Sequence, residues 1–202
     1  MYYSELQIDK YIREKFFKDK NENMIMIEVG GGPPEFLSMS KHFRDSGWRA
    51  ISIDPNPKFV QQHKALGNEV YQYACSNECR KGTFNIVDVK SWGDEREGIS
   101  SSAIDIRYDL SPHHTIEKID VEIITLNSLL ENLNIAAINL LCVDTEGWEL
   151  EVVQGLDMLK YNVEIVVLEN LLHNESYNEY MQENGYTLDQ KIEINDIYRR
   201  NT

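Results

Sequence analysis

The chain has 202 residues, a length that suits one domain with room for a substantial hydrophobic core. Asp and Glu number 34 against 20 Lys and Arg, so the formal net charge at pH 7 is −14. We see no basic patch that interrupts this negative field, so nucleic acid and anionic membranes are poor partners.

The sequence also indicates where in the cell the protein is expected. No apolar run approaches the roughly 20 residues that a membrane-spanning helix needs, and residues 1–17 lack the apolar centre of a signal peptide. The three cysteines, Cys75, Cys79 and Cys142, are an odd number, as expected for free thiols in a reducing environment. We therefore expect a cytoplasmic protein without a membrane span.

The chain begins with an N-terminal helical segment in residues 1–20, where apolar residues recur at helical spacing. The stretch MIMIEVGGGPPEF follows at residues 24–36 and predicts a buried strand, a tight turn and a helix. Gly30, Gly31 and Gly32 suit a turn against which a ligand lies, because they carry no Cβ. Pro34 suits the first turn of a helix that we expect to reach residue 46.

The glycine turn excludes two common ligands and favours a third. A dinucleotide fingerprint needs Gly or Ala where Glu35 stands, and a phosphate-binding loop needs N–H groups that Pro33 and Pro34 lack. The remaining pattern, acid-x-Gly-x-Gly, suits a nucleoside-bearing ligand without a pyrophosphate, most commonly S-adenosylmethionine. We expect Glu28 to face the cationic end of that ligand.

Apolar runs then alternate with helical stretches along the chain. We predict strands at 48–53, 70–75, 83–87, 121–126, 137–143, 164–168, 186–189 and 192–199, and helices at 58–66, 127–133, 147–159 and 176–184. Residues 88–120 have no clear period, and we interpret them as a substrate-binding loop or lid. The pattern predicts one α/β domain over residues 1–202, with a doubly wound, mostly parallel seven-stranded sheet covered by helices on both faces.

Four of the predicted strands are each followed by an acid, namely Glu28, Asp54, Asp144 and Glu169. Because ligands bind at the carboxyl ends of parallel strands, we expect these side chains to meet along one edge of the sheet. Asp54, next to Pro55, lies at about the distance from the glycine turn expected for an acid that binds ribose hydroxyls. Ser76 and neighbouring backbone groups, after the third strand, would then meet adenine.

These motifs together resemble the FkbM-type S-adenosylmethionine-dependent methyltransferases. The resemblance covers about residues 24–200 and is carried by IEVGGGPP, ISIDPNP, LLCVDTEGWELEVVQG, VVLEN and GYTL. Its most specific part is Asp-x-Glu-Gly-x-Glu with a later glycine, here Asp144, Glu146, Gly147, Glu149 and Gly155. This chain departs from the usual family pattern at three positions, Glu28, Pro34 and Asn127.

The resemblance implies a Rossmann-like class I methyltransferase fold and transfer of a methyl group to a hydroxyl of a sugar or glycan. Methylation of a non-sugar small molecule such as a polyketide is the alternative within the same chemistry. A non-catalytic module that binds the adenosyl cofactor, or a nicotinamide oxidoreductase, would be different classes of protein. The third fingerprint position disfavours the oxidoreductase.

An aliphatic hydroxyl is a very weak acid, so a general base or a metal ion must assist its deprotonation. In the first scheme Asp144 and Glu146 act as base and substrate anchor, with Glu169 nearby and His173 as a further base. In the second, Asp144, Glu169 and Asn170 bind Mg²⁺ or Mn²⁺ through oxygen atoms. Capping of the next helix is the purely structural alternative for the acids. His113 and His114 are weaker base candidates in the middle loop.

Overall fold

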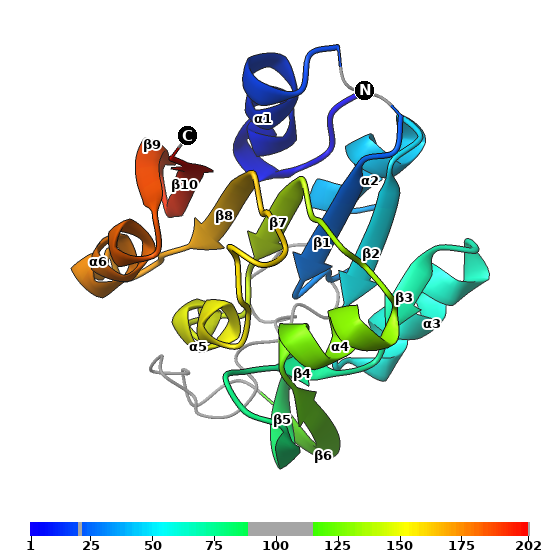
Figure 1. The fold of residues 1–202 in the computed structure, drawn as a ribbon. Helices are drawn as coiled ribbons and strands as arrows, with labels where there is room; N and C mark the ends of the chain where they lie inside the picture. The colour runs from blue at the N-terminus through cyan, green and yellow to red at the C-terminus, as the bar shows by residue number, and fades with distance from the viewer. Residues whose placement is uncertain (20–21, 89–114, 202) are drawn as a thin grey trace.

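The structure, a computed structural model, describes residues 1–19, 22–88 and 115–201. Its centre is a seven-stranded sheet in the order β3-β2-β1-β7-β8-β10-β9 (Figure 1). Strand β10 pairs antiparallel with both of its neighbours, and all other pairs in this sheet are parallel. The strands span Glu69–Tyr71 (β3), Arg49–Ile53 (β2), Ile25–Val29 (β1), Leu140–Val143 (β7), Ile165–Glu169 (β8), Asn195–Arg200 (β10) and Tyr186–Ile192 (β9).

Helices cover both faces of this sheet, so the predicted fold class is confirmed (Figure 1). Helices α1 and α2 pack on one face, and α4, α5 and α6 pack on the other, while α3 lies beside β3. Their bounds are Ile8–Phe16 (α1), Met39–Asp45 (α2), Pro57–Ala65 (α3), Leu126–Asn132 (α4), Glu149–Gln154 (α5) and Glu175–Glu183 (α6). None of the helices in the described residues combines the length and apolar character that crossing a membrane requires.

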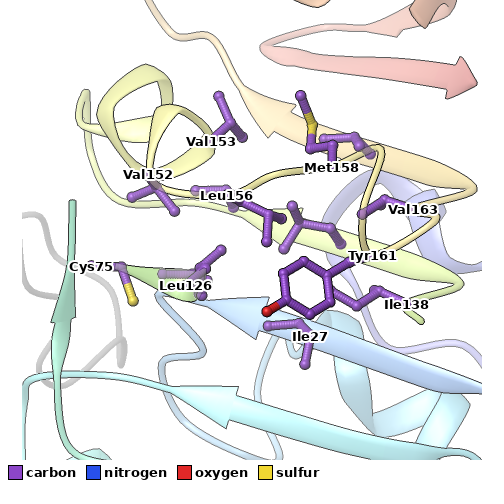
Figure 2. Close-up of a cluster of buried hydrophobic side chains, with 14 of the residues drawn as sticks. Ile27, Cys75, Leu126, Ile138, Val152, Val153, Leu156, Met158, Tyr161 and Val163 are labelled. Atoms are coloured by element: carbon purple, nitrogen blue, oxygen red, sulfur yellow. The ribbon is translucent and has the colours of Figure 1, made fainter. Parts of the chain in front are cut away.

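The central strands are apolar throughout because successive side chains enter two different cores. Met26 packs with α1 and α2, whereas its neighbour Ile27 packs with α4 and α5. In β7, Leu140 likewise packs in the core of α1 and α2, and Leu141 packs in the core of α4 and α5. Figure 2 shows the second core, where Val152 and Val153 of α5 join side chains from β1 and α4.

A second, three-stranded sheet of order β4-β6-β5 was not predicted as a separate unit. Its strands are Ala74–Cys75 (β4), Thr115–Ile124 (β6) and Arg80–Asp88 (β5). The strand predicted at 70–75 is therefore divided between two sheets, because Ala74 and Cys75 pair with the end of β6. Residues 115–120 belong to β6 and not to an irregular loop, since they pair with β5 along its length. Residues 89–114, including His113 and His114, lie outside the described residues.

Helix α2 begins at Met39, five residues later than the position that we predicted for Pro34. The reason is that the N–H groups of its first turn are capped by the side chains of Ser38, directly before the helix, and of Glu28 in β1. The Ser38 hydroxyl accepts a hydrogen bond from the N–H of Lys41, and the Glu28 carboxylate accepts bonds from Met39 and Ser40. Residues 34–37 instead form a turn and a bend after the end of β1.

The N-terminal segment forms a short 3-10 turn, Glu5–Gln7, before α1. The buried Asp9 side chain holds this segment in place by accepting hydrogen bonds from the N–H groups of Tyr3, Ser4 and Lys10 and from the Ser4 hydroxyl. Residues before α1 are thereby fixed beside the end of the sheet where the cleft described next opens.

Candidate active site

A cleft of about 400 Å³ opens at the carboxyl ends of β1 and β7. This is where the strand order reverses, because the chain passes from β1 to β2 and β3 and later returns to β7 on the other side of β1. Ligands of open α/β sheets bind at such a point, and the volume lies in the range of small-molecule sites, about 300–1,000 Å³. All four acids that we predicted at strand ends line the cleft: Glu28, Asp54, Asp144 and Glu169. Glu28 does not follow its strand as predicted but lies within β1, one residue before its end.

The glycine turn forms one wall of the cleft and is tightly packed against the loop after β7. Gly30 has a φ of 77°, and a Cβ atom built on it would lie 1.7 Å from the carbonyl oxygen of Asp144. No side chain fits there. Gly32 also has a positive φ, 52°, and donates its N–H to Asp54 at 2.9 Å. The turn is therefore fixed to the ends of both β2 and β7.

Asp54 is buried at the end of β2 and accepts hydrogen bonds from two backbone N–H groups, those of Gly32 and Asn56. Burial raises the pKa of its carboxyl to about 6, although both hydrogen bonds act in the opposite direction. A carboxylate has about four acceptor positions, so Asp54 keeps acceptor capacity toward the cleft. Pro55 lines the cleft beside it.

Glu28 also lines the cleft, but its oxygens are already engaged. One accepts hydrogen bonds from Met39 at 2.9 Å and Ser40 at 3.2 Å, and the other accepts from the Ser52 hydroxyl at 3.3 Å. Burial raises the pKa of Glu28. The side chain of Glu28 thus caps α2 and adds negative charge beside the cleft. Both of its oxygens are bonded to protein groups, whereas the sequence suggested that they would face a ligand.

Three carboxyl groups lie together on the opposite wall. Asp144 follows β7 and is open to the cleft, Glu169 ends β8, and Glu146 lies on the loop between β7 and α5. Asp144 and Glu169 are hydrogen-bonded to each other through their side chains. Desolvation by the surrounding protein, followed by repulsion among the acids, raises the pKa of each of the three groups. At neutral pH such a group holds protons that isolated carboxyls would release.

Glu149 organises this loop, a role that the sequence did not predict. Its buried carboxylate accepts hydrogen bonds from the N–H groups of Thr145 at 2.8 Å and Gly147 at 3.0 Å and from the Thr145 hydroxyl at 3.2 Å. A fourth comes from the hydroxyl of Tyr177 in α6 at 2.8 Å. Glu146 lies inside this turn with a backbone φ of 59°, a value that residues other than glycine rarely adopt.

One signal for Glu149 was available in the sequence. It is the last acid of the Asp-x-Glu-Gly-x-Glu block and stands at the start of a predicted helix, where an acid can reach back to preceding N–H groups. The contact with Tyr177 carried no such signal, because the two residues are brought together only by the packing of α6 against α5.

The predicted metal ligands are only partly brought together. Oxygen atoms of Asp144, Glu169 and Glu149 lie within 4.8 Å of one another, but Glu149 already accepts four hydrogen bonds. Asn170 is buried away from the cleft. Its amide oxygen accepts from the N–H of Asn174, and its amide nitrogen donates to Asp196 and to the carbonyl of Asn174. The residues present therefore do not fit the proposed oxygen-ligand trio.

Ser76 and His173 do not line the cleft. The buried Ser76 hydroxyl accepts a hydrogen bond from the indole of Trp148 at 3.1 Å, whereas the preceding residues Ala74 and Cys75 do reach the cleft. A Cβ on Gly155 would lie 2.2 Å from the carbonyl oxygen of Ser76, so this glycine lets the two loops approach. His173 is exposed, with a φ of 49°.

The fold and the cleft define an α/β protein with a cleft of small-molecule size at its switch point. The family described as "Methyltransferase FkbM domain" matches residues 14–188. The chain belongs to this methyltransferase family, and the family indicated by the sequence motifs is thus confirmed.

Curated proteins gave no significant match. Among solved structures, the chain is similar to that of "a putative caffeoyl-CoA O-methyltransferase from Staphylococcus aureus", with 14% identity and a TM-score of 0.49. The match covers 96% of this chain and 81% of that one.

Proposed function

We propose that this protein is an S-adenosylmethionine-dependent O-methyltransferase that methylates a hydroxyl of a sugar or glycan. The observation that carries the proposal is that the glycine turn after β1 and the carboxyl groups after β7 and β8 line the same cleft. A donor site and a proton acceptor are the two parts that methyl transfer to oxygen requires. Membership of the FkbM family supports the reaction class.

The methyl donor, when bound, supplies a methyl group already activated on a sulfonium. We assign its binding to the backbone of Gly30, Gly31 and Gly32 and to Asp54, Pro55 and Asp144. The free acceptor capacity of Asp54 suits ribose hydroxyls. Glu28, although bonded to α2, adds negative charge that favours a cationic donor. Ala74 and Cys75, next to Ser76, line the wall that we assign to the adenine.

We assign proton removal from the acceptor hydroxyl to Asp144. Its raised pKa makes it a better proton acceptor than an ordinary aspartate, and Glu169 holds its carboxylate by a hydrogen bond. Glu146, in the loop fixed by Glu149, would anchor a second hydroxyl of the acceptor. Orientation of the hydroxyl by these groups lowers the barrier because the reaction needs an in-line approach.

We assign no metal ion to this reaction. Asn170, the third ligand that the sequence suggested, is bonded to Asn174 and Asp196, and the Glu149 carboxylate already accepts four hydrogen bonds. Asp144 and Glu169 alone are a pair that shares a proton readily.

The test has two steps. Thermal denaturation with and without S-adenosylhomocysteine measures donor-site binding, which should raise the melting temperature. Turnover of S-adenosylmethionine is then measured against a panel of neutral glycosides for the wild type, Asp144→Asn and, as a control on an exposed position outside the cleft, Glu14→Gln. We expect Asp144→Asn to reduce turnover at least 100-fold and Glu14→Gln to leave it unchanged. Binding of the cofactor without turnover of any acceptor would favour a non-catalytic module.

A further inference from the structure

We infer that the acceptor of this enzyme is an uncharged hydroxyl compound with an apolar face, and that phosphate-bearing acceptors such as sugar nucleotides are rejected. The inference rests on the proposed function and narrows its acceptor class. It follows from three features of the cleft: the charges on its walls, the hydrogen bonds that its backbone N–H groups already make, and the apolar side chains at its rim.

The charges on the cleft walls are all of one sign. Among the lining residues that the structure describes there is no Lys, Arg or His. Six carboxyl groups line it: Glu5, Glu28, Asp54, Asp144, Glu146 and Glu169. Glu28 and Asp54 belong to the part assigned to the donor, and Asp144, Glu146 and Glu169 keep some of their protons at neutral pH. A phosphate brought into the rest of the cleft therefore meets no cation among the described lining residues and the negative charge of the acids that are ionised, at a place where partial burial weakens screening by water. Recognition of phosphate in proteins relies on Arg, Lys or clustered N–H donors.

The glycine turn and the start of the loop after β7, where a phosphate would need clustered N–H donors, use those donors within the protein. The N–H groups of Gly30 and Gly31 both point at the carbonyl of Ile53, at 2.9 and 3.4 Å, and that of Gly32 is bonded to Asp54. On the opposite wall the N–H of Asp144 is bonded to the carbonyl of Val29. The N–H groups of Thr145 and Gly147 are bonded to Glu149. The two loops that flank the cleft thus bind their own carboxylates and carbonyls where a phosphate loop would bind its anion.

The rim of the cleft is apolar. Phe36, Leu37 and Leu171 line it and are 47%, 38% and 39% exposed, which is high for large apolar side chains that belong to one hollow. Leu37 also has a φ of 52°, a conformation that leucine rarely adopts. An acceptor that covers these side chains gains burial of apolar surface, whereas a sugar alone would leave them in water.

A consequence concerns the order of reactions. The sugar that this cleft accepts is one already attached to an apolar group, because a nucleoside diphosphate would bring two phosphates toward the acidic walls. The class of reaction that supplies the substrate is therefore glycosyl transfer to an apolar acceptor, and methylation follows it.

The experiment compares two matched probes, p-nitrophenyl β-D-glucoside and its 6-phosphate. Their affinities for the protein saturated with S-adenosylhomocysteine are measured by titration calorimetry at low ionic strength. We expect the neutral probe to bind at least tenfold more tightly. Equal affinities, tighter binding of the phosphate, or no saturable binding of the neutral glucoside overturns the inference.

A pair of charge variants tests the cause. Glu5→Lys reverses a charge in the cleft wall, and Glu14→Lys makes the same change on an exposed position of α1 outside the cleft. We expect Glu5→Lys to tighten binding of the phosphate probe about fivefold, with a loss of the effect at high salt, and Glu14→Lys to change nothing. Equal effects of the two variants overturn the electrostatic cause. Failure to bind S-adenosylhomocysteine in the first step refutes the proposed function, whereas a reversed probe order with that cofactor bound refutes only the present inference.

Discussion

Gly30 and Asp144 come so close that a Cβ atom on the glycine would lie 1.7 Å from the carbonyl oxygen of the aspartate. Because that oxygen belongs to the backbone, no rotamer change can relieve the clash. We predict that Gly30→Ala destabilises the fold by about 3 kcal/mol or more. Gly32→Ala is the matched control, since Gly32 also has a positive φ but no atom within 4 Å of the added Cβ, and about 1 kcal/mol is expected. Urea denaturation of both variants measures the difference, and equal losses would contradict the packing described for Gly30.

Glu149 and Tyr177 are predicted to support the loop that carries Glu146. Replacing Glu149 by Leu leaves the N–H groups of Thr145 and Gly147 without their acceptor, and we expect a loss of about 2–4 kcal/mol. Tyr177→Phe removes one hydrogen bond and should lose about 1–2 kcal/mol. Both values come from chemical denaturation. A Glu149→Leu variant as stable as the wild type would show that the loop does not depend on this carboxylate.

The acids of the cleft should reduce stability at alkaline pH. The pKa of Glu169 in the folded state is raised by burial and then by the charge of Asp144. Its contribution to stability is therefore complete below the ordinary carboxyl pKa, about 4.3, and is lost progressively as pH rises toward the raised folded value. Glu169→Gln removes this dependence. We expect equal melting temperatures for the variant and the wild type near pH 4 and an increase of about 2–4 °C for the variant at pH 8. An increase that is the same at both pH values would point to packing and not to charge.

Turnover should rise with pH if Asp144 accepts the proton. Desolvation by the walls of the cleft, followed by the charge of Glu149, raises the pKa of Asp144 to about 7, so the deprotonated form becomes dominant between about pH 6 and pH 8. We predict that kcat/KM increases about tenfold or more across that interval and reaches a plateau above it. The measurement is the initial rate over pH 5.5–9 with a neutral glycoside that the panel identifies. A flat profile would remove Asp144 from the role of base.

Chelation should leave turnover unchanged. The amide of Asn170 is bonded within the protein, and Glu149, whose oxygen lies near those of Asp144 and Glu169, already accepts four hydrogen bonds, so we expect no cation to be needed. Activity is measured after dialysis against EDTA and again with Mg²⁺ or Mn²⁺ restored. Loss of activity that either ion restores would reinstate the metal scheme.

The sequence predicted the main sheet well because its signals are local. Each central strand is an apolar run with an acid at or next to its carboxyl end, and this pattern at Glu28, Asp54, Asp144 and Glu169 predicted that four carboxyls line one edge. The second sheet was missed because Ala74 pairs with Ile123, a partner that no local pattern identifies.

Two site details were beyond the sequence for a similar reason. Asn170 follows Glu169 directly, as a ligand would, yet the structure turns its amide toward Asp196 on β10. The start of α2 was misplaced because a carboxylate from β1, Glu28, caps it. In each case a polar partner distant in the chain takes part, together with the adjacent Ser38 at the start of α2, whereas sequence patterns report mainly apolar periodicity.

Asp88 and Thr115 are paired at the open end of the β5–β6 ladder. The two residues that flank the stretch 89–114 are therefore held opposite each other in the ladder. Because loop closure depends only weakly on length, insertions or deletions in that stretch would leave the register of β5 and β6 intact. The fold thus permits the length and sequence of this stretch to change during evolution while the rest of the domain stays the same.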